Sequence, residues 1–262
     1  MRTTPRLLFS LLAAISLTTS SLHAQVIQAW NFNDTLGTSL TGLAKTGSAS
    51  ATLSADITGV TTTGSGALDV AYNSTTAAYG YADISGSMSA TGTYRLSVTF
   101  SSWNLTNGAN VTANARETFY VALRSTATQS SSLFADLTVL STATGVDVRF
   151  RDQSNTYLIL DDASTSLTGP LTVNLTLNRA AATYDISYTL GGSTFNSVTG
   201  AALTNTRSIA TLSLGALGDY TNSDLLVDSV SFSAVPEPSA FSLLAASVAL
   251  GLALANRRRR VR

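Results

Sequence analysis

The chain has 262 residues, of which 44% are hydrophobic and only 11% are charged, well below the roughly 25% of an ordinary soluble domain. The formal net charge is zero, but seven of the 15 basic residues lie in the two ends, so the segment 25–235 carries 8 basic and 14 acidic residues and offers no basic surface for nucleic acid. The absence of Cys and the single His at position 23 exclude disulfides, thiolate metal sites and most nucleophile–base catalysis in that segment.

The first 24 residues have the three parts of a secretory signal peptide. Arg2 and Arg6 supply the positive charge, residues 7–17 form a largely apolar run too short to cross a bilayer, and a polar stretch ends at Ala24. We therefore expect signal peptidase to cleave between Ala24 and Gln25. An N-terminal anchor that is not cleaved is the alternative.

The segment 25–234 has apolar residues at every second position, which is the period of a β-strand with one buried face. The pattern is clearest in four segments: 94–100, 146–151, 171–178 and 184–190. Weaker patterns predict strands at 26–32, 51–57, 66–72, 79–84, 117–124, 133–140, 155–160, 194–199, 209–215 and 225–233. Turn residues separate these segments at short intervals, and no amphipathic helix interrupts them. We predict an all-β domain, an antiparallel two-sheet sandwich of the jelly-roll type.

Parts of this segment resemble the concanavalin A-like jelly rolls of lectin and laminin-G-type domains. The resemblance lies in the strand texture of 28–34, in the run 171–178 followed by 183–186, and in 226–230 near the end. It implies a two-sheet sandwich whose first and last strands are neighbours.

The last 28 residues, 235–262, differ sharply from the domain before them. Pro236 and Pro238 flank Glu237 and cannot continue a strand, so they end the folded domain. The apolar run that follows predicts a transmembrane helix at about 239–256, marginally long enough for a bilayer. The positive-inside rule places the terminal arginines in the cytoplasm. These are Arg257, Arg258, Arg259, Arg260 and Arg262.

The order of these three parts, Pro-Glu-Pro, helix and Arg cluster, resembles the PEP-CTERM sorting signal. The resemblance implies processing near Pro236–Pro238 by an exosortase-type membrane enzyme, in a Gram-negative-type bacterium that makes extracellular polysaccharide. It also implies an exported protein, held transiently in the inner membrane by the C-terminal helix and then placed at the cell surface or in the extracellular matrix. A plain membrane anchor with an accidental Pro-Glu-Pro is the alternative.

The only cofactor that the sequence suggests is a structural Ca²⁺, since hard oxygen ligands are all that the domain offers. Asp228 shares the alternation of Leu226, Val230 and Phe232, so its carboxylate is expected on the apolar face and in need of a partner. Asp34 would supply a second ligand if the first and last strands are adjacent. A place on the solvent side of a bulged strand, or hydrogen bonds from backbone N–H groups, would also explain Asp228.

Four aromatic residues are candidates for glycan contact, because they fall in predicted loops or on polar faces: Trp103, Tyr120, Tyr157 and Tyr220. Catalytic candidates are few. Glycoside hydrolysis requires two suitably spaced carboxylates, and Glu117 is the only Glu between residues 25 and 235. We therefore expect a non-enzymatic module of the cell envelope or exopolysaccharide matrix that contacts extracellular polysaccharide. The alternative is an enzyme that acts on such a polysaccharide, with no catalytic residue assigned.

Overall fold

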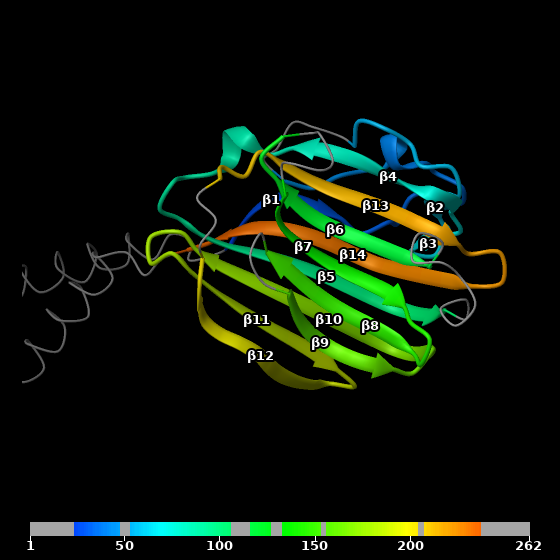
Figure 1. The fold of residues 1–262 in the computed structure, drawn as a ribbon. Coiled ribbons are helices and arrows are strands. Elements are labelled where there is room, and N and C mark those ends of the chain that lie inside the picture. Colours follow the sequence, from blue (N-terminus) through cyan, green and yellow to red (C-terminus); the bar gives the residue numbers. More distant parts are fainter. Residues whose placement is uncertain are drawn as a thin grey trace, which may run out of the picture. The chain divides into compact units, whose positions relative to one another are not determined.

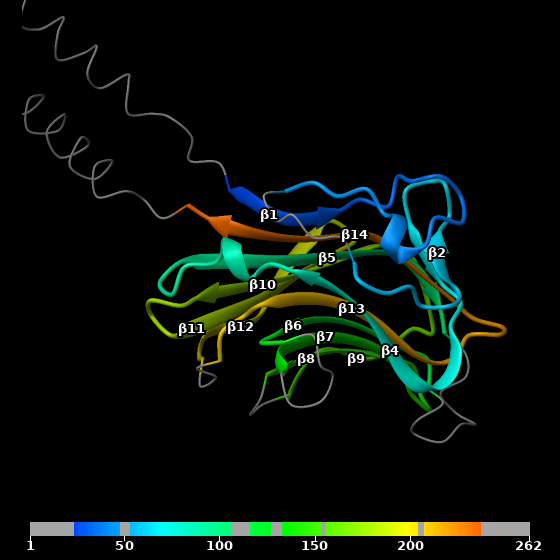
Figure 2. The same ribbon diagram turned by 90° about the horizontal axis from the view of Figure 1, so that it is seen from above.

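A computed structural model describes residues 24–47, 53–105, 116–126, 133–152, 156–203 and 207–236. Within it, Gln25–Ala234 form one compact unit with its own hydrophobic core. Two antiparallel sheets lie face to face in this unit, one above the other (Figure 2). The predicted all-β sandwich is confirmed, and the described residues contain no α-helix, only two short 3-10 turns. These are η1 (Leu40–Gly42) and η2 (Ser85–Ser87).

The first sheet has eight strands in the order β12-β11-β10-β5-β14-β3-β2, with β1 paired to the remaining part of β14. Its strands are β1 (Gln25–Trp30), β2 (Val60–Thr62), β3 (Leu68–Val70), β5 (Thr93–Asn104), β10 (Ser166–Asn178), β11 (Thr183–Leu190), β12 (Ser193–Ala202) and β14 (Asp224–Val235). Since β1 and β14 pair, the first and last strands are neighbours, as the sequence resemblance implied.

The second sheet has six strands in the order β4-β13-β6-β7-β8-β9 and faces the viewer in Figure 1. Its strands are β4 (Asn73–Asp83), β6 (Thr118–Arg124), β7 (Leu133–Ser141), β8 (Val146–Asp152), β9 (Thr156–Ala163) and β13 (Thr211–Asp219). Every pairing in this sheet is antiparallel.

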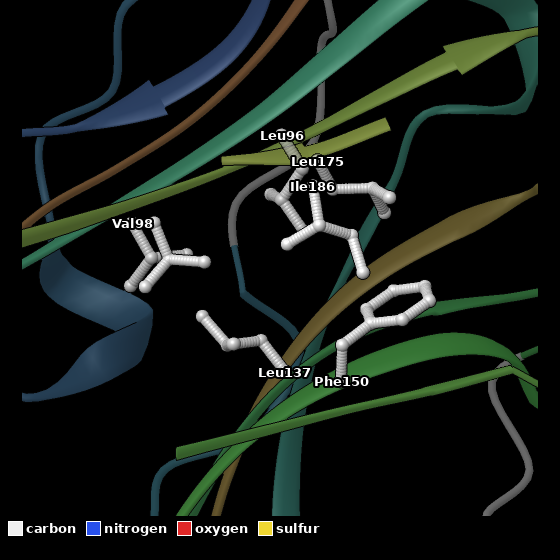
Figure 3. A pocket seen from close by; sticks show the side chains of 7 residues that line it. Leu96, Val98, Leu137, Phe150, Leu175 and Ile186 are labelled. Carbon is white, nitrogen blue, oxygen red and sulfur yellow. The ribbon is translucent and has the colours of Figure 1, made fainter. Parts of the chain in front are cut away.

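The space between the sheets is filled by apolar side chains. Figure 3 shows Leu96, Val98 and Ile186 of the eight-stranded sheet facing Leu137 and Phe150 of the six-stranded sheet. The gap among them is only about 10 Å³, roughly the room that one water molecule needs. This part of the inter-sheet core therefore holds no ligand-sized space.

The four clearest predicted strands are all present, and the turn between β11 and β12 is made by Gly191 and Gly192. Both glycines have positive φ (57° and 82°), as a tight two-residue hairpin turn requires. The strand predicted at 51–57 is wrong for its described part, 53–57, which is a loop. Leu53 and Ile57 are buried there four residues apart, so the two apolar residues anchor a loop rather than one face of a strand.

The two ends of the compact unit leave it from neighbouring strands, because Gln25 pairs with Ala234. Pro236 follows the end of β14 directly. No helix within the described ranges is long and apolar enough to cross a membrane. The predicted signal peptide up to residue 23, the helix at about 239–256, Glu237, Pro238 and the arginines at 257–260 and 262 lie outside the described residues.

Candidate functional site

The outer face of the six-stranded sheet combines aromatic and charged side chains. It exists because strand side chains alternate. On β6, Phe119, Val121 and Leu123 point into the core, whereas Tyr120 and Arg124 point outward. We call this surface the polar sheet face and define it by Tyr79, Tyr81, Tyr120, Arg124, Asp136, Thr138, Asp147, Arg149, Arg151 and Ser213. The strand register places these residues in rows across β4, β13, β6, β7 and β8.

Three tyrosines form a cluster at the β4 side of the polar sheet face. The ring of Tyr79 lies 6.2 Å from that of Tyr81 and 5.7 Å from that of Tyr120, between ring centroids. Between Tyr79 and Tyr120 the register places Gly215 of β13. A Cβ atom on Gly215 would overlap the Tyr79 ring, and Gly215 does not have the positive φ that would demand glycine. The missing side chain is therefore the space in which the Tyr79 ring lies.

Arg124 holds the tyrosine cluster in place through its contact with the ring of Tyr79. Its side chain is only 3% exposed, and its Cζ atom lies 4.7 Å from the centroid of the Tyr79 ring, within the range of a cation–π contact. The Arg124 Nε–H group donates to the hydroxyl of Ser213 at 3.3 Å, and that hydroxyl donates to the Ala122 carbonyl oxygen at 3.3 Å. These bonds hold the guanidinium against the sheet, so Tyr79 has a defined orientation.

Two ion pairs occupy the β8 side of the polar sheet face. Arg151 donates from Nε (3.3 Å) and Nη2 (2.5 Å) to the two oxygens of Asp136, a bidentate arrangement. Arg149 donates from Nε (3.1 Å) and from Nη2 to one oxygen of Asp147. In each pair the acid is buried and the base exposed: the side chains of Arg151 and Arg149 are 52% and 38% exposed, those of Asp136 and Asp147 only 1% and 5%.

Burial also sets the protonation of this surface. It raises the pKa of the Tyr120 hydroxyl to about 12, with a further contribution from Tyr79. Burial raises the pKa values of Tyr79 and Tyr81 as well, against the opposing effect of Arg124. The tyrosines are therefore neutral hydroxyl groups near pH 7. Burial likewise raises the pKa of the Asp136 carboxyl, which the bond from Arg151 opposes.

Of the four aromatic residues predicted to contact glycan, only Tyr120 lies on the polar sheet face. Trp103 is 2% exposed and donates from Nε1 to the Ser164 carbonyl oxygen at 3.1 Å, because the alternation of β5 breaks before it and turns it inward. Tyr220 is 3% exposed in the core. Tyr157 packs against Phe150 and Tyr184 at the core edge, with ring centroids 6.4 and 6.1 Å away. The burial of Trp103 and Tyr220 contradicts the prediction for these two residues, whereas the half-buried Tyr157 stays a prediction.

The predicted position of Asp228 on the apolar face is also wrong. On β14 the alternation changes phase: Leu225 and Val227 are buried, then Val230 and Phe232, which leaves Asp228 exposed. Asp34 accepts a hydrogen bond from the Ala44 amide at 3.0 Å. Within the described ranges no three His, Cys, Asp or Glu residues come together as metal ligands. Because Asp228 is exposed to solvent, its carboxylate does not need a bound cation.

Asp69, on the strand β3 that pairs with β14, is an acid whose ionised form the fold disfavours. Asp69 of β3 lies opposite Leu226 and is half-buried; burial, and then repulsion from Asp224, raise the pKa of its carboxyl above the usual 3.8. The folded protein therefore binds the Asp69 proton more tightly than the unfolded chain does. This contribution to the free energy of unfolding is lost as the pH rises through the raised pKa.

We expect Asp69→Asn to raise the melting temperature near neutral pH by about 1 °C, a small effect because solvent screens a half-exposed charge. The gain should disappear below pH 3.8, where both folded and unfolded wild-type chains bind the proton. Thermal unfolding of wild type and variant across this pH range is the measurement. Asp228→Asn, which removes an exposed charge from the same sheet, is the control, and an equal effect of both changes would contradict the assignment to Asp69.

The acids on the polar sheet face are poorly arranged for glycoside hydrolysis. Asp136 pairs in register with Arg151, whereas Asp147 lies four residues before Arg151 on β8, so the two acids lie in different rows of the face. Hydrolysis by paired carboxylates needs both groups to act on one glycosidic bond. Each of these two acids is also engaged by a guanidinium. Glu117 is fully buried, so it does not open onto this surface.

Comparison with known proteins finds no matching family model and no matching curated protein. Among solved structures, the chain is similar to the carbohydrate recognition domain of Emp47p, with 10% identity, a TM-score of 0.46, and coverage of 83% of this chain and 100% of that one. It is similar to an endo-1,3-beta-glucanase from Streptomyces sioyaensis, with 12% identity, a TM-score of 0.47, and coverage of 80% and 95%. A legume lectin-like domain from Entamoeba histolytica has 8% identity, a TM-score of 0.44, and coverage of 63% and 82%.

Proposed function

We propose that this protein is an exported, non-catalytic module that binds extracellular polysaccharide through the polar sheet face. The observation that carries the proposal is the tyrosine cluster. Tyr79, Tyr81 and Tyr120 are half-buried, close together and held by Gly215 and Arg124. Aromatic rings beside fixed polar groups are what a ligand with both apolar and hydroxylated faces requires, as sugars do.

The shape of the surface supports a polymer rather than a single sugar as the ligand. The tyrosines, Thr138 and the arginines of β8 lie in rows that cross five strands, and adjacent strands are about 4.8 Å apart. The rows therefore extend for roughly 19 Å. An extended chain that crosses the strands would contact the tyrosines and the arginines together.

The terminal segments support the cellular part of the proposal. A signal peptide cleaved at Ala24–Gln25 and a sorting signal of the PEP-CTERM type at 235–262 would place the β-domain outside the cytoplasm, where polysaccharide is available. Signal peptidase and an exosortase-type enzyme would process the two ends, which leave the domain from neighbouring strands. The membrane contact would be the helix predicted at about 239–256.

Screening the folded unit 25–235 against immobilised polysaccharides tests the binding function. For the best ligand, we expect Tyr79→Ala and Tyr120→Ala each to weaken binding about tenfold, because each removes a large part of the aromatic surface. Tyr188→Ala is the matched control, since Tyr188 is a half-buried tyrosine of the other sheet. If no polysaccharide binds, or if all three variants behave alike, the polar sheet face is not a glycan site.

A further inference from the structure

The β8 side of the polar sheet face presents positive charge to solvent although its formal charges balance. Arg149 and Arg151 are separated by one residue on β8 and point to the same side of the sheet. Their guanidinium groups are exposed, while the carboxylates of Asp147 and Asp136 lie buried beneath them. Because the guanidinium groups lie at the surface and the carboxylates beneath them, a ligand on this surface meets the guanidinium groups first.

These guanidinium groups also retain hydrogen-bonding capacity. A guanidinium has five N–H donors. Arg151 directs Nε and Nη2 to Asp136, and Arg149 directs Nε and Nη2 to Asp147, so the Nη1 groups of both are not used in these pairs. The bidentate bond to Asp136 fixes the orientation of Arg151 in advance, and a fixed guanidinium loses less entropy when it binds an anion.

The neighbouring acid on β9 limits where an anion can lie. Val148 pairs with Leu160 and Val146 with Ala163, so the exposed Asp161 lies in the irregular stretch of β9 that faces Asp147, at one end of the arginine pair. Arg151 lies at the other end, opposite Thr156, and the row beyond Arg149 ends at the uncharged Leu158. An anionic group is therefore favoured on the Arg151 side, one row away from the row in which Arg149 and Thr138 lead to Tyr120.

We propose that the ligand of the polar sheet face is an acidic polysaccharide, whose carboxylate or sulfate groups bind Arg149 and Arg151 while its sugar rings lie on the tyrosine cluster. This rests on the proposed function and adds the chemical class of the ligand. Guanidinium groups suit both anions because each offers two oxygens to parallel N–H donors. The net negative charge of the domain would otherwise repel such a chain, which is why the two exposed arginines matter.

The test compares three polymers on the folded unit 25–235: a polyuronate such as alginate, dextran sulfate and neutral dextran. We expect one or both acidic polymers to bind more tightly than dextran, and the affinity to fall as ionic strength rises. Arg149→Gln and Arg151→Gln should each weaken this binding about tenfold. Arg95→Gln is the control, because Arg95 is exposed on the eight-stranded sheet and the change alters the net charge equally.

Folding of the variants is measured by circular dichroism. Arg151→Gln leaves the buried Asp136 without its cation, so the double variant Asp136→Asn, Arg151→Gln, which removes both charges, serves as a second form of the test. It should fold and show the same loss of acidic-polymer binding.

The outcomes separate the two proposals. Binding of the polyuronate alone, or of dextran sulfate alone, supports the inference and identifies the anion. An equal loss in Arg95→Gln overturns it, because the attraction would then be a general charge effect. Tyrosine-dependent binding of neutral polymers without any preference for acidic ones also overturns it and leaves the glycan-binding function intact. Absence of binding to every polysaccharide overturns the glycan-binding function itself.

Discussion

Trp103→Ala is expected to destabilise the β-domain by about 3–5 kcal/mol, in the range of large aromatic deletions from a core. Trp103 is 2% exposed, and its ring packs edge-on against Phe100 at 6.2 Å between centroids. The substitution leaves a cavity beside Phe100. It also removes the hydrogen bond to the Ser164 carbonyl oxygen, a smaller loss because Ser164 is exposed and water can replace the donor.

Thermal unfolding of the unit 25–235 measures this effect. For a domain of this size we expect the melting temperature to fall by about 10 °C. Phe195→Ala is the matched control, because Phe195 is 47% exposed and the change should cost about 1 kcal/mol or less. Below its melting temperature the Trp103 variant should bind polysaccharide as the wild type does. A large loss of binding in a stable Trp103 variant would restore Trp103 as a contact residue.

Trp103 lies where the alternation along β5 no longer predicts which side chains are buried. The alternation of Tyr94, Leu96, Val98 and Phe100 predicts their burial correctly, because a regular strand repeats every two residues. The repeat breaks after Phe100: Ser101 and Ser102 are half-buried, and Trp103 turns inward. The pairing of β5 with β10 is irregular in the same region, between Thr168 and Leu171. The sequence placed Trp103 in a loop or on a polar face, whereas irregular pairing with the distant strand β10 accompanies its inward turn.

The same physical cause explains Asp228. Its predicted burial assumed one phase along β14, whereas the strand changes phase between Val227 and Val230. The first part of β14 pairs with β3 and the second part with β1, so two different partners set the two phases. The choice of partner depends on the whole fold, and no local pattern in 224–235 specifies it.

The polar sheet face was only partly accessible from sequence. The alternation of 146–151 already separates Asp147, Arg149 and Arg151 from the apolar residues, and the structure confirms that separation. The pairing of Arg151 with Asp136, however, depends on the register between β7 and β8. The position of Gly215 between Tyr79 and Tyr120 depends on β13 lying between β4 and β6, although β13 follows both in the chain. Which strands lie side by side is set by the topology of the whole sheet. The alternation within a single strand does not predict it.

Gly215→Ala is expected to abolish most of the glycan binding by the polar sheet face while the domain stays folded. The added Cβ would overlap the ring of Tyr79, and the nearby Ala78 carbonyl oxygen limits the room for the backbone to adjust. The ring is the more easily displaced group, because it is half-buried at the surface. Its movement would break the contacts with Tyr120 and Arg124 together, so we expect a loss of affinity of tenfold or more, roughly that of Tyr79→Ala.

A double-mutant cycle with Tyr79→Ala tests whether the methyl group acts through this ring. In the Tyr79→Ala background, Gly215→Ala should have no further effect on polysaccharide affinity, because the ring that it displaces is already absent. Gly86→Ala is the control for a glycine with open space at Cβ, and it should change neither affinity nor stability. Circular dichroism and titration with the best-binding polysaccharide provide the two readouts. Additive losses in the double variant would mean that Gly215 acts on the sheet itself, and the tyrosine cluster would then not depend on the missing side chain.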